Sequence, residues 1–182
     1  MGSVFTFVAD DALRPADGDA CHHCGCQNQP IYDYFGEIID AEKAADPELA
    51  RTEPDVSWLC APCINSGNVR RTDTWSVEDT IPRFAENTEA AWADFNRLPN
   101  IPLFLQGKLD WPLCCGTWCE FTGSPGNLDE LVAVQTTHQY WAGGPARARR
   151  DFASQGEPES LEEISLFRCT RCARHFYTDQ FT

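Results

Sequence analysis

The sequence has few basic residues, and this scarcity limits the ligands that the protein can take. Only 14 Lys and Arg stand against 28 Asp and Glu, which gives a formal net charge of -14 over 182 residues. A protein that binds nucleic acid gains affinity by neutralising phosphates with clustered Lys and Arg. DNA and RNA are therefore not expected as direct ligands, whereas the acidic balance suits solubility and encounter with a basic partner.

Long apolar runs and familiar catalytic motifs are also absent from the sequence. No run of about eighteen apolar residues occurs, and residues 1–20 lack the basic and apolar regions of a signal peptide. We therefore expect a cytoplasmic protein without a membrane segment. HExxH, the HxE and PCxxC elements of a zinc deaminase, and GxSxG are missing too. A non-enzymatic protein is favoured over a zinc-dependent or thiol enzyme, which stays open as the alternative.

What the chain does contain is enough apolar surface for a folded core. Hydrophobic residues make up 42% of the chain and aromatic residues 12%, including six Trp and eleven Phe. This composition is too apolar for a disordered chain, despite the charge. Ten cysteines then need an explanation other than disulfides, because a reducing cytosol keeps disulfides open. Metal binding is one such explanation.

Eight of the ten cysteines form four closely spaced pairs. A short spacing lets a tight turn point both sulfurs at one ion, while a distant pair supplies the other two corners of a tetrahedron. Four pairs therefore predict two structural zinc sites, because four thiolates form a closed shell for zinc, although such a site also accepts iron. The predicted ligands are Cys21 and Cys24, Cys60 and Cys63, Cys115 and Cys119, and Cys169 and Cys172.

Three other interpretations of these pairs carry less weight. A thioredoxin-like redox motif needs a CxxC that opens a helix, but CAPC is followed by INSGNVRR, a poor helix. Substitution of a thiol by a histidine would involve His22 or His23, which lie inside the first pair and are expected to face solvent. Disulfides remain the third explanation.

The pairs can combine into sites sequentially, interleaved or nested. Shorter loops cost slightly less entropy to close, and this favours the sequential arrangement. Its first site is made of Cys21, Cys24, Cys60 and Cys63, and its second of Cys115, Cys119, Cys169 and Cys172. Cys26 and Cys114 are then spare, and we expect their substitution to be tolerated.

The hydrophobic pattern between the pairs predicts an α+β fold. We expect a small zinc-stabilised fold with two zinc-ribbon or knuckle-like four-cysteine sites, short antiparallel strands and a few helices. Strands are predicted over residues 3–9, 29–38 and on both sides of the last pair within 164–181, as in the hairpin of a zinc ribbon. Helices are predicted after a capping box at Ser76, over 88–98 and over 127–134. In the second of these, Ala91, Phe95 and Leu98 share one buried face.

The predicted organisation has two halves. Residues 1–75 form an N-terminal zinc-knuckle half, and residues 76–182 form a helical segment followed by a C-terminal zinc-ribbon half. We expect the two halves to pack as one unit. Residues 143–160, rich in Gly, Ser and charge, are the best candidate for a linker.

The order of the motifs resembles the bacterial CbrC family. The resemblance spans roughly residues 5–181 and is carried by CAPCINSG, WPLCCGTWCEFTG and LFRCTRCARHFYTDQF. It implies a small cytoplasmic protein without an assigned biochemical activity, in a family whose namesake is linked to tolerance of a nuclease colicin. It also implies that Cys115 and Cys119 stand on the family's cysteines, whereas Cys114 stands where the family often has another residue such as His.

Charge and resemblance together predict a function. We expect a non-enzymatic zinc protein that gives tolerance to a bacterial toxin by binding it, the partner being a basic, nuclease-type toxin that meets an acidic surface. A regulatory zinc-ribbon adaptor of the transcription machinery is a further alternative. That alternative requires a basic or aromatic face for nucleic acid, which the sequence does not offer.

Overall fold

The computed structural model confirms the α+β fold class. It describes residues 2–41, 45, 54–71, 80–95, 98, 111–141, 152, 156 and 158–179. In these residues, short helices accompany three small sheets. The chain divides into two units: the knuckle unit, Arg14–Thr74 with Pro99–Pro102, and the ribbon unit, Met1–Leu13, Trp75–Leu98 and Leu103–Thr182. The first residues of the chain thus belong to the same unit as its C-terminal half.

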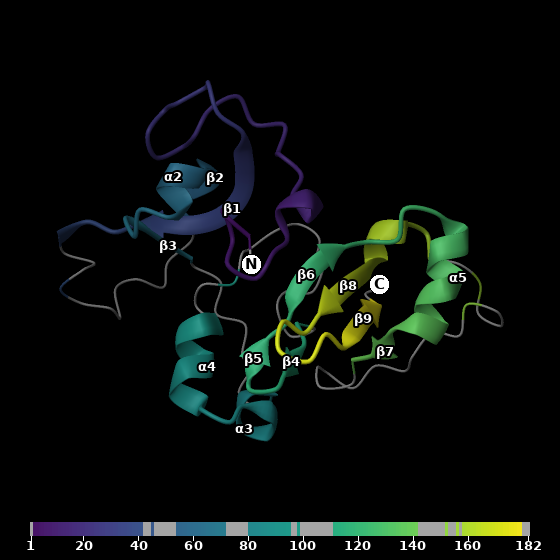
Figure 1. The fold of residues 1–182 in the computed structure, drawn as a ribbon. Coiled ribbons are helices and arrows are strands. Elements are labelled where there is room, and N and C mark those ends of the chain that lie inside the picture. Colours follow the sequence, from purple (N-terminus) through teal and green to yellow (C-terminus); the bar gives the residue numbers. More distant parts are fainter. Residues whose placement is uncertain are drawn as a thin grey trace. The chain divides into compact units, whose positions relative to one another are not determined.

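The knuckle unit is built on an antiparallel sheet with the strand order β2-β1-β3 (Figure 1). Its strands are β1 (Ile31–Ile38), β2 (Val56–Cys60) and β3 (Val69–Arg71). Ile31, Tyr34 and Leu59 are buried and form its apolar centre. A single helical turn, α2 (Ala61–Ile64), follows β2 directly and contains Cys63.

The ribbon unit contains a sheet with the order β6-β8-β9-β7 (Figure 1). Its strands are β6 (Glu120–Gly123), β7 (Gln139–Tyr140), β8 (Ile164–Arg168) and β9 (His175–Asp179). β8 and β9 pair antiparallel around the last cysteine pair, as the zinc-ribbon pattern predicts, and β7 joins β9 in parallel. A separate hairpin consists of β4 (Leu113–Cys114) and β5 (Thr117–Trp118).

The helices of the ribbon unit are α3 (Thr80–Phe84), α4 (Thr88–Phe95) and α5 (Leu128–Thr137), with 3-10 turns η1 (Asp10–Ala12) and η3 (Leu161–Glu163). α4 buries Ala91 and Phe95, as its pattern predicts, whereas Leu98 is buried beyond the helix end. Asn127 caps α5 by accepting a hydrogen bond from the Glu130 amide at 3.0 Å. None of the described helices has the length and apolarity that a membrane crossing requires.

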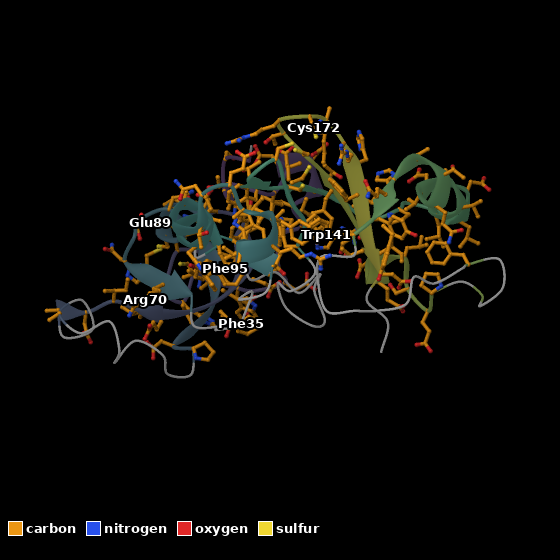
Figure 2. The ribbon with its side chains drawn as sticks, turned by 90° about the horizontal axis from the view of Figure 1, so that it is seen from below. Phe35, Arg70, Glu89, Phe95, Trp141 and Cys172 are labelled. Atoms are coloured by element: carbon orange, nitrogen blue, oxygen red, sulfur yellow. The ribbon has the colours of Figure 1, made fainter. Side chains whose placement is uncertain are left out.

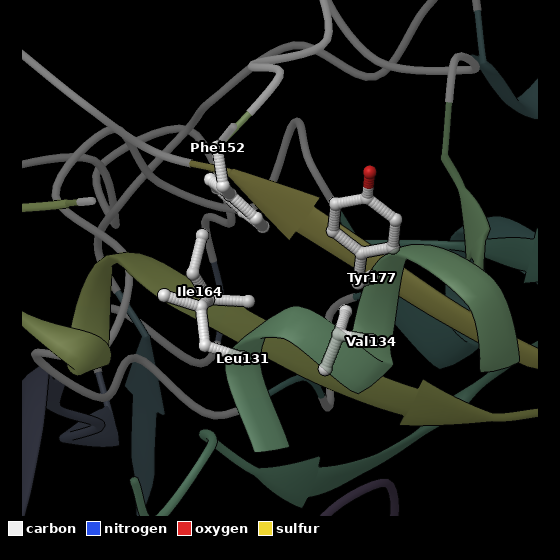
Figure 3. Packing of buried hydrophobic residues seen from close by; sticks show 5 residues of the cluster. All are labelled: Leu131, Val134, Phe152, Ile164 and Tyr177. Carbon is white, nitrogen blue, oxygen red and sulfur yellow. The ribbon is translucent and has the colours of Figure 1, made fainter. Parts of the chain in front are cut away.

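Two groups of buried side chains hold the ribbon unit together. Trp111, Phe121 and Phe167 pack as an aromatic group whose ring centroids lie 5.5 to 6.5 Å apart. The second group places helix α5 against the sheet, as Figure 3 shows for its five side chains. Its members are Leu131, Val134, Phe152, Ile164 and Tyr177.

The predicted strand at residues 3–9 was wrong. Phe5, Phe7 and Val8 are buried, so the apolar pattern does report burial, but only Val8 forms a bridge, to Phe121. The reason is a turn in which the Val8 amide donates to the Phe5 carbonyl at 3.2 Å. The predicted capping box at Ser76 lies outside the described residues, as does most of the predicted linker at 143–160.

Candidate metal centres

The structure brings Cys21, Cys24, Cys60 and Cys63 together in the knuckle unit, as the sequential arrangement requires. We call these residues the first cysteine group. Their four sulfurs all lie within 4.8 Å of one another, and the sulfurs of Cys24 and Cys60 are 3.7 Å apart. Every cysteine of the chain is free, and the 3.7 Å separation is far beyond the roughly 2.05 Å of a disulfide.

Two turns present these thiols. Between Cys21 and Cys24 the chain closes on itself, because the Gly25 amide donates to the Cys21 carbonyl at 2.8 Å and Gly25 adopts a φ of 71°. Cys60 ends β2 and precedes the single turn α2, whose proline at its start suits a helix N-terminus. The helical turn brings Cys63 back beside Cys60. The pair CAPC is thus a strand-to-helix corner, although its continuation is a poor helix.

The histidines of CHHC contact the site in a way that the sequence did not reveal. His23 Nδ1 lies 3.2 Å from the Cys63 sulfur, and His22 Nδ1 accepts a hydrogen bond from the Ser57 amide at 3.2 Å. The His22 ring also packs on Trp58, with centroids 5.0 Å apart. His23 is therefore placed as a neighbour of a thiol rather than as a substitute for one.

The electrostatics of the first cysteine group are those of thiols that crowd one another. Burial disfavours ionisation of Cys21, but hydrogen bonds from the backbone of Cys24, Cys60 and His23 outweigh it and lower its pKa to about 6. Burial and the neighbouring thiols raise the pKa of Cys63 far above its usual range. Four adjacent thiols cannot all ionise cheaply without a counter-charge, and a divalent cation supplies that charge.

The second cysteine group, in the ribbon unit, consists of Cys114, Cys115, Cys169 and Cys172, whose sulfurs also lie within 4.8 Å of one another. The Cys114 sulfur is 3.8 Å from that of Cys115 and 3.8 Å from that of Cys172. Cys172 lies in the connection between β8 and β9, marked in Figure 2. This group joins a short hairpin in the middle of the chain to the ribbon hairpin near its end.

A tight turn accounts for the two adjacent ligand candidates Cys114 and Cys115. Cys115 and Gly116 have φ values of 53° and 67°, as the two central residues of a type I′ hairpin turn require. Glycine takes this conformation without strain, and the turn joins β4 to β5 directly. The Arg171 guanidinium then donates to the Cys115 carbonyl at 2.8 Å, which ties this turn to the connection between β8 and β9.

Cys119 does not belong to the second cysteine group, and Cys114 does, which reverses the placement expected from the sequence. The spacing in CGTWC predicts that one tight turn points both sulfurs at the same ion, but Thr117 and Trp118 are extended and carry Cys119 away from the turn. Cys119 is fully buried, and its amide donates to the Pro112 carbonyl at 2.8 Å. Its own carbonyl accepts a hydrogen bond from Trp111 Nε1 at 2.8 Å. The backbone of Cys119 is thus held in the core on both sides.

Among the remaining thiols, too, one has a lowered pKa and the others have raised pKa values. The Arg174 backbone lowers the pKa of Cys172 to about 7, helped by hydrogen bonds from the neighbouring thiols. Burial raises the pKa of Cys114 and of Cys119 far above the usual range. In the knuckle unit, Cys26 lies near Cys24 and Cys60, and the neighbouring Cys24 thiol raises its pKa to about 12. Each cysteine group therefore has one further thiol close by.

The sulfur separations match what a tetrahedral zinc ion needs. Four thiolates at about 2.3 Å from zinc stand about 3.8 Å from one another along the edges of a tetrahedron. The 3.7 Å and 3.8 Å separations have this length. Each group can therefore hold a metal ion with four sulfurs, and the chain has two such groups among its described residues.

Comparison with known proteins adds no family to this geometry: no protein-family model, no curated protein and no solved structure matches the chain.

Proposed function

We propose that the protein is a non-enzymatic binding protein whose two cysteine groups each hold a structural zinc ion. The observation that carries this proposal is the four-sulfur composition of both groups, whose sulfurs all lie within 4.8 Å of one another, with Cys24–Cys60 and Cys114–Cys172 about one tetrahedral edge apart. Zinc is the preferred metal because it binds thiolates and accepts the tetrahedral arrangement of four ligands. Iron is the competing ion for an all-thiolate site.

A structural role follows from the number of ligands. A catalytic zinc site keeps one of its positions for water and uses three protein ligands, often His or a carboxylate. Four sulfurs fill a tetrahedron and leave no such position. His23, the one imidazole within contact of a described cysteine-group sulfur, lies at hydrogen-bond distance from Cys63 and can donate to its thiolate. This arrangement supports a metal that stabilises the fold.

The partner that we propose is a basic protein, and the class of partner is a nuclease-type bacterial toxin. Each filled group adds four thiolates and one divalent ion, a change of -2, so two filled groups take the formal charge from -14 to -18. Nuclease toxins must bind nucleic acid and tend to be basic, so an acidic surface attracts them over a long range. The resemblance to the CbrC family, linked to colicin tolerance, supports the same class.

Each unit has exposed acidic side chains of its own, and two elements of the ribbon unit begin with such residues. Helix α5 begins with Asp129 and Glu130, and the 3-10 turn η1 begins with Asp10 and Asp11. The exposed acidic residues in the described part of the chain are Asp10, Asp11, Asp17, Asp19, Asp40, Asp55, Glu86, Glu89, Asp129, Glu130, Glu159 and Glu162. Their exposure supports long-range attraction of a basic partner.

A binding experiment with the zinc-loaded protein tests the proposed partner class. Catalytically inactive nuclease toxins from bacteria are immobilised and the protein is passed over them at about 50 mM and then 500 mM salt, because screening acts within roughly 10 Å at 0.1 M. We expect binding whose association rate falls steeply with salt, together with rescue of cells that express the active toxin. An acidic protein of the same net charge is the control. Absence of both binding and rescue across the toxins tested would refute the proposed partner.

A further inference from the structure

The ribbon unit contains a cavity beside the second cysteine group that the proposed function does not use. Its volume is about 400 Å³, within the roughly 300–1,000 Å³ of small-molecule sites. Cys114 and Cys115 form part of its wall, but its volume is far larger than a metal ion requires. The other side chains that define its chemistry are Arg83, Arg174, Phe84, Tyr140, Trp141 and Phe176.

Aromatic rings form a continuous wall of this cavity. The Phe84 and Trp141 centroids are 5.0 Å apart, and those of Trp141 and Phe176 are 5.8 Å apart with the planes at 85°. The Trp141 amide donates to the Tyr177 carbonyl at 2.9 Å, which fixes Trp141 beside β9, near the position labelled in Figure 2. Such a wall offers faces and edges on which a flat ring can stack.

Two arginines give the cavity positive charge. The Arg83 guanidinium lies over the Phe84 ring, 5.0 Å from its centroid, and Arg174 immediately precedes β9. Neither has a carboxylate within ion-pair distance among the described residues, whereas Arg168 is 2.7 Å from Glu120 and Arg171 is 3.8 Å from Glu86. Both arginines are exposed at the cavity, so their guanidinium groups can reach an anion that enters it.

The wall also contains a polar side chain, because Gln139 can donate and accept hydrogen bonds. Trp141 is 9% exposed and contributes its ring to the wall, whereas its Nε1 atom is buried and out of reach of a ligand.

We propose that this cavity binds a small aromatic acid, that is, a flat ring that carries a carboxylate or a phosphate. The ring stacks against Phe84, Trp141 and Phe176, and the anionic group lies between the guanidinium groups of Arg83 and Arg174, where charge-assisted hydrogen bonds are strong. This inference does not depend on a protein partner, and its test is independent of the test of the proposed function.

The same two arginines have a second explanation, which the test must separate from the first. A filled second cysteine group carries a charge of -2, and nearby guanidinium groups would compensate it without any ligand. If charge compensation is their sole role, substitution of an arginine weakens metal retention at the second cysteine group, and the wild-type protein does not bind the aromatic acid. If they bind an acid, ligand affinity falls while metal retention holds.

Calorimetric titration of the full zinc-loaded chain distinguishes these roles. The probes are phenyl phosphate and benzoate, with inorganic phosphate lacking the ring and benzyl alcohol lacking the charge. We expect at least one aromatic acid to bind at least tenfold more tightly than either incomplete probe. Arg83→Gln should then weaken that acid by about tenfold or more, as loss of a charged hydrogen bond does. Arg14→Gln, which removes the same charge outside the cavity, should leave the affinity unchanged.

Arg174→Gln provides a second variant, because it removes the other guanidinium group that lines the cavity. It should weaken the acid about tenfold without lowering the thermal midpoint of the free protein, because among the described residues no carboxylate lies within ion-pair distance of this side chain. Zinc content, measured in every variant, should stay at the wild-type value. Three results would overturn the proposal: no aromatic acid binding in the millimolar range, equal binding of acids and benzyl alcohol, or zinc loss from Arg83→Gln without loss of affinity.

Discussion

The sulfurs of Cys114 and Cys172 lie 3.8 Å apart although 58 positions separate the two residues in the sequence. One belongs to the β4–β5 hairpin and the other to the connection between β8 and β9. The Arg171 side chain bridges the same two segments by its hydrogen bond to the Cys115 carbonyl. The second cysteine group therefore acts as a clasp, since a metal held there fixes two distant segments of the ribbon unit to one another.

Substitution of Cys114 and of Cys119 should have opposite effects on metal content. Cys114→Ala removes one of four sulfurs from the second cysteine group, so this variant should bind one zinc ion fewer. Its ribbon unit should unfold at a much lower temperature. Structural zinc contributes on the order of 10 to 16 kcal/mol in small domains. Cys119→Ala should keep two zinc ions and lose only about 1 to 2 kcal/mol of core packing. Elemental analysis together with thermal unfolding measures both effects.

The matched pair decides between two assignments of the ligands. Both substitutions delete a buried thiol, so a difference in zinc content reflects coordination rather than burial. Retention of two zinc ions by Cys114→Ala and loss of one by Cys119→Ala would restore the assignment based on spacing and overturn the geometric one.

The turn that presents Cys114 and Cys115 should be sensitive to its glycine. Gly116→Ala places a Cβ at a φ of 67°, 3.1 Å from the Glu86 side chain, and should cost about 1 to 2 kcal/mol while it weakens zinc at the second group. Gly67→Ala, at a φ of 76° with open space around it, is the control for backbone strain alone. Competition with a chelator measures zinc loss. Equal rates of zinc loss in both variants would argue against the turn's role.

Much of the ribbon unit could be predicted because its determinants are local. Strands form on both sides of Cys169 and Cys172 as the sequence predicts, and Asn127 caps α5 through a contact only three residues away. The same holds for the first cysteine group, whose pairs lie in short turns.

The errors arose where a tight turn replaces the element that the residue pattern indicates. Residues 3–9 have the alternation of a strand, but a turn from Phe5 to Val8 interrupts it and only Val8 bridges to Phe121. Cys115 and Cys119 have the spacing of a ligand pair, but the hairpin turn at Cys115 and Gly116 places the Cys114 sulfur beside that of Cys115. The extended Thr117–Trp118 segment leads Cys119 away from this group. The Cys-Gly dipeptide is the sequence feature that indicates this hairpin turn, because glycine favours the positive φ that the turn requires.

The ion pair between Glu37 and Arg70 should matter more than an ordinary surface pair. The Glu37 carboxylate is fully buried, and Arg70 Nε donates to it at 3.1 Å across β1 and β3. Arg70→Met leaves that carboxylate without its guanidinium and should lower the free energy of unfolding by about 2 to 3 kcal/mol. Urea unfolding of the zinc-loaded protein measures the change.

A second substitution shows whether that cost comes from the buried charge. Glu37→Gln combined with Arg70→Met removes the charge as well and should recover part of the loss. A double variant no more stable than Arg70→Met would mean that the guanidinium contributes by packing instead.

His138 should make the ribbon unit less stable as the pH falls from 7.5 to 6.0. Burial lowers the pKa of His138, and the His175 ring, 5.1 Å away between centroids, lowers it further. The unfolded chain then binds a proton at a higher pH than the folded protein does, so the stabilisation present above the ordinary pKa is lost as pH falls through the lowered one. Thermal midpoints across this range measure the slope.

A histidine substitution isolates that contribution. His138→Gln removes the titrating ring and should flatten the pH dependence, whereas His22→Gln in the knuckle unit should leave the ribbon transition unchanged. An identical slope in wild type and His138→Gln would exclude His138 as its source.

We propose that the chain holds two zinc ions through eight thiolates, four in each cysteine group. Native mass spectrometry of protein expressed in zinc-supplemented medium, combined with elemental analysis, counts these ions directly. We expect a single species with two zinc ions per chain, and one zinc ion in each of the variants Cys60→Ala and Cys114→Ala. Fewer than two ions in the wild type, or iron in place of zinc, would contradict it.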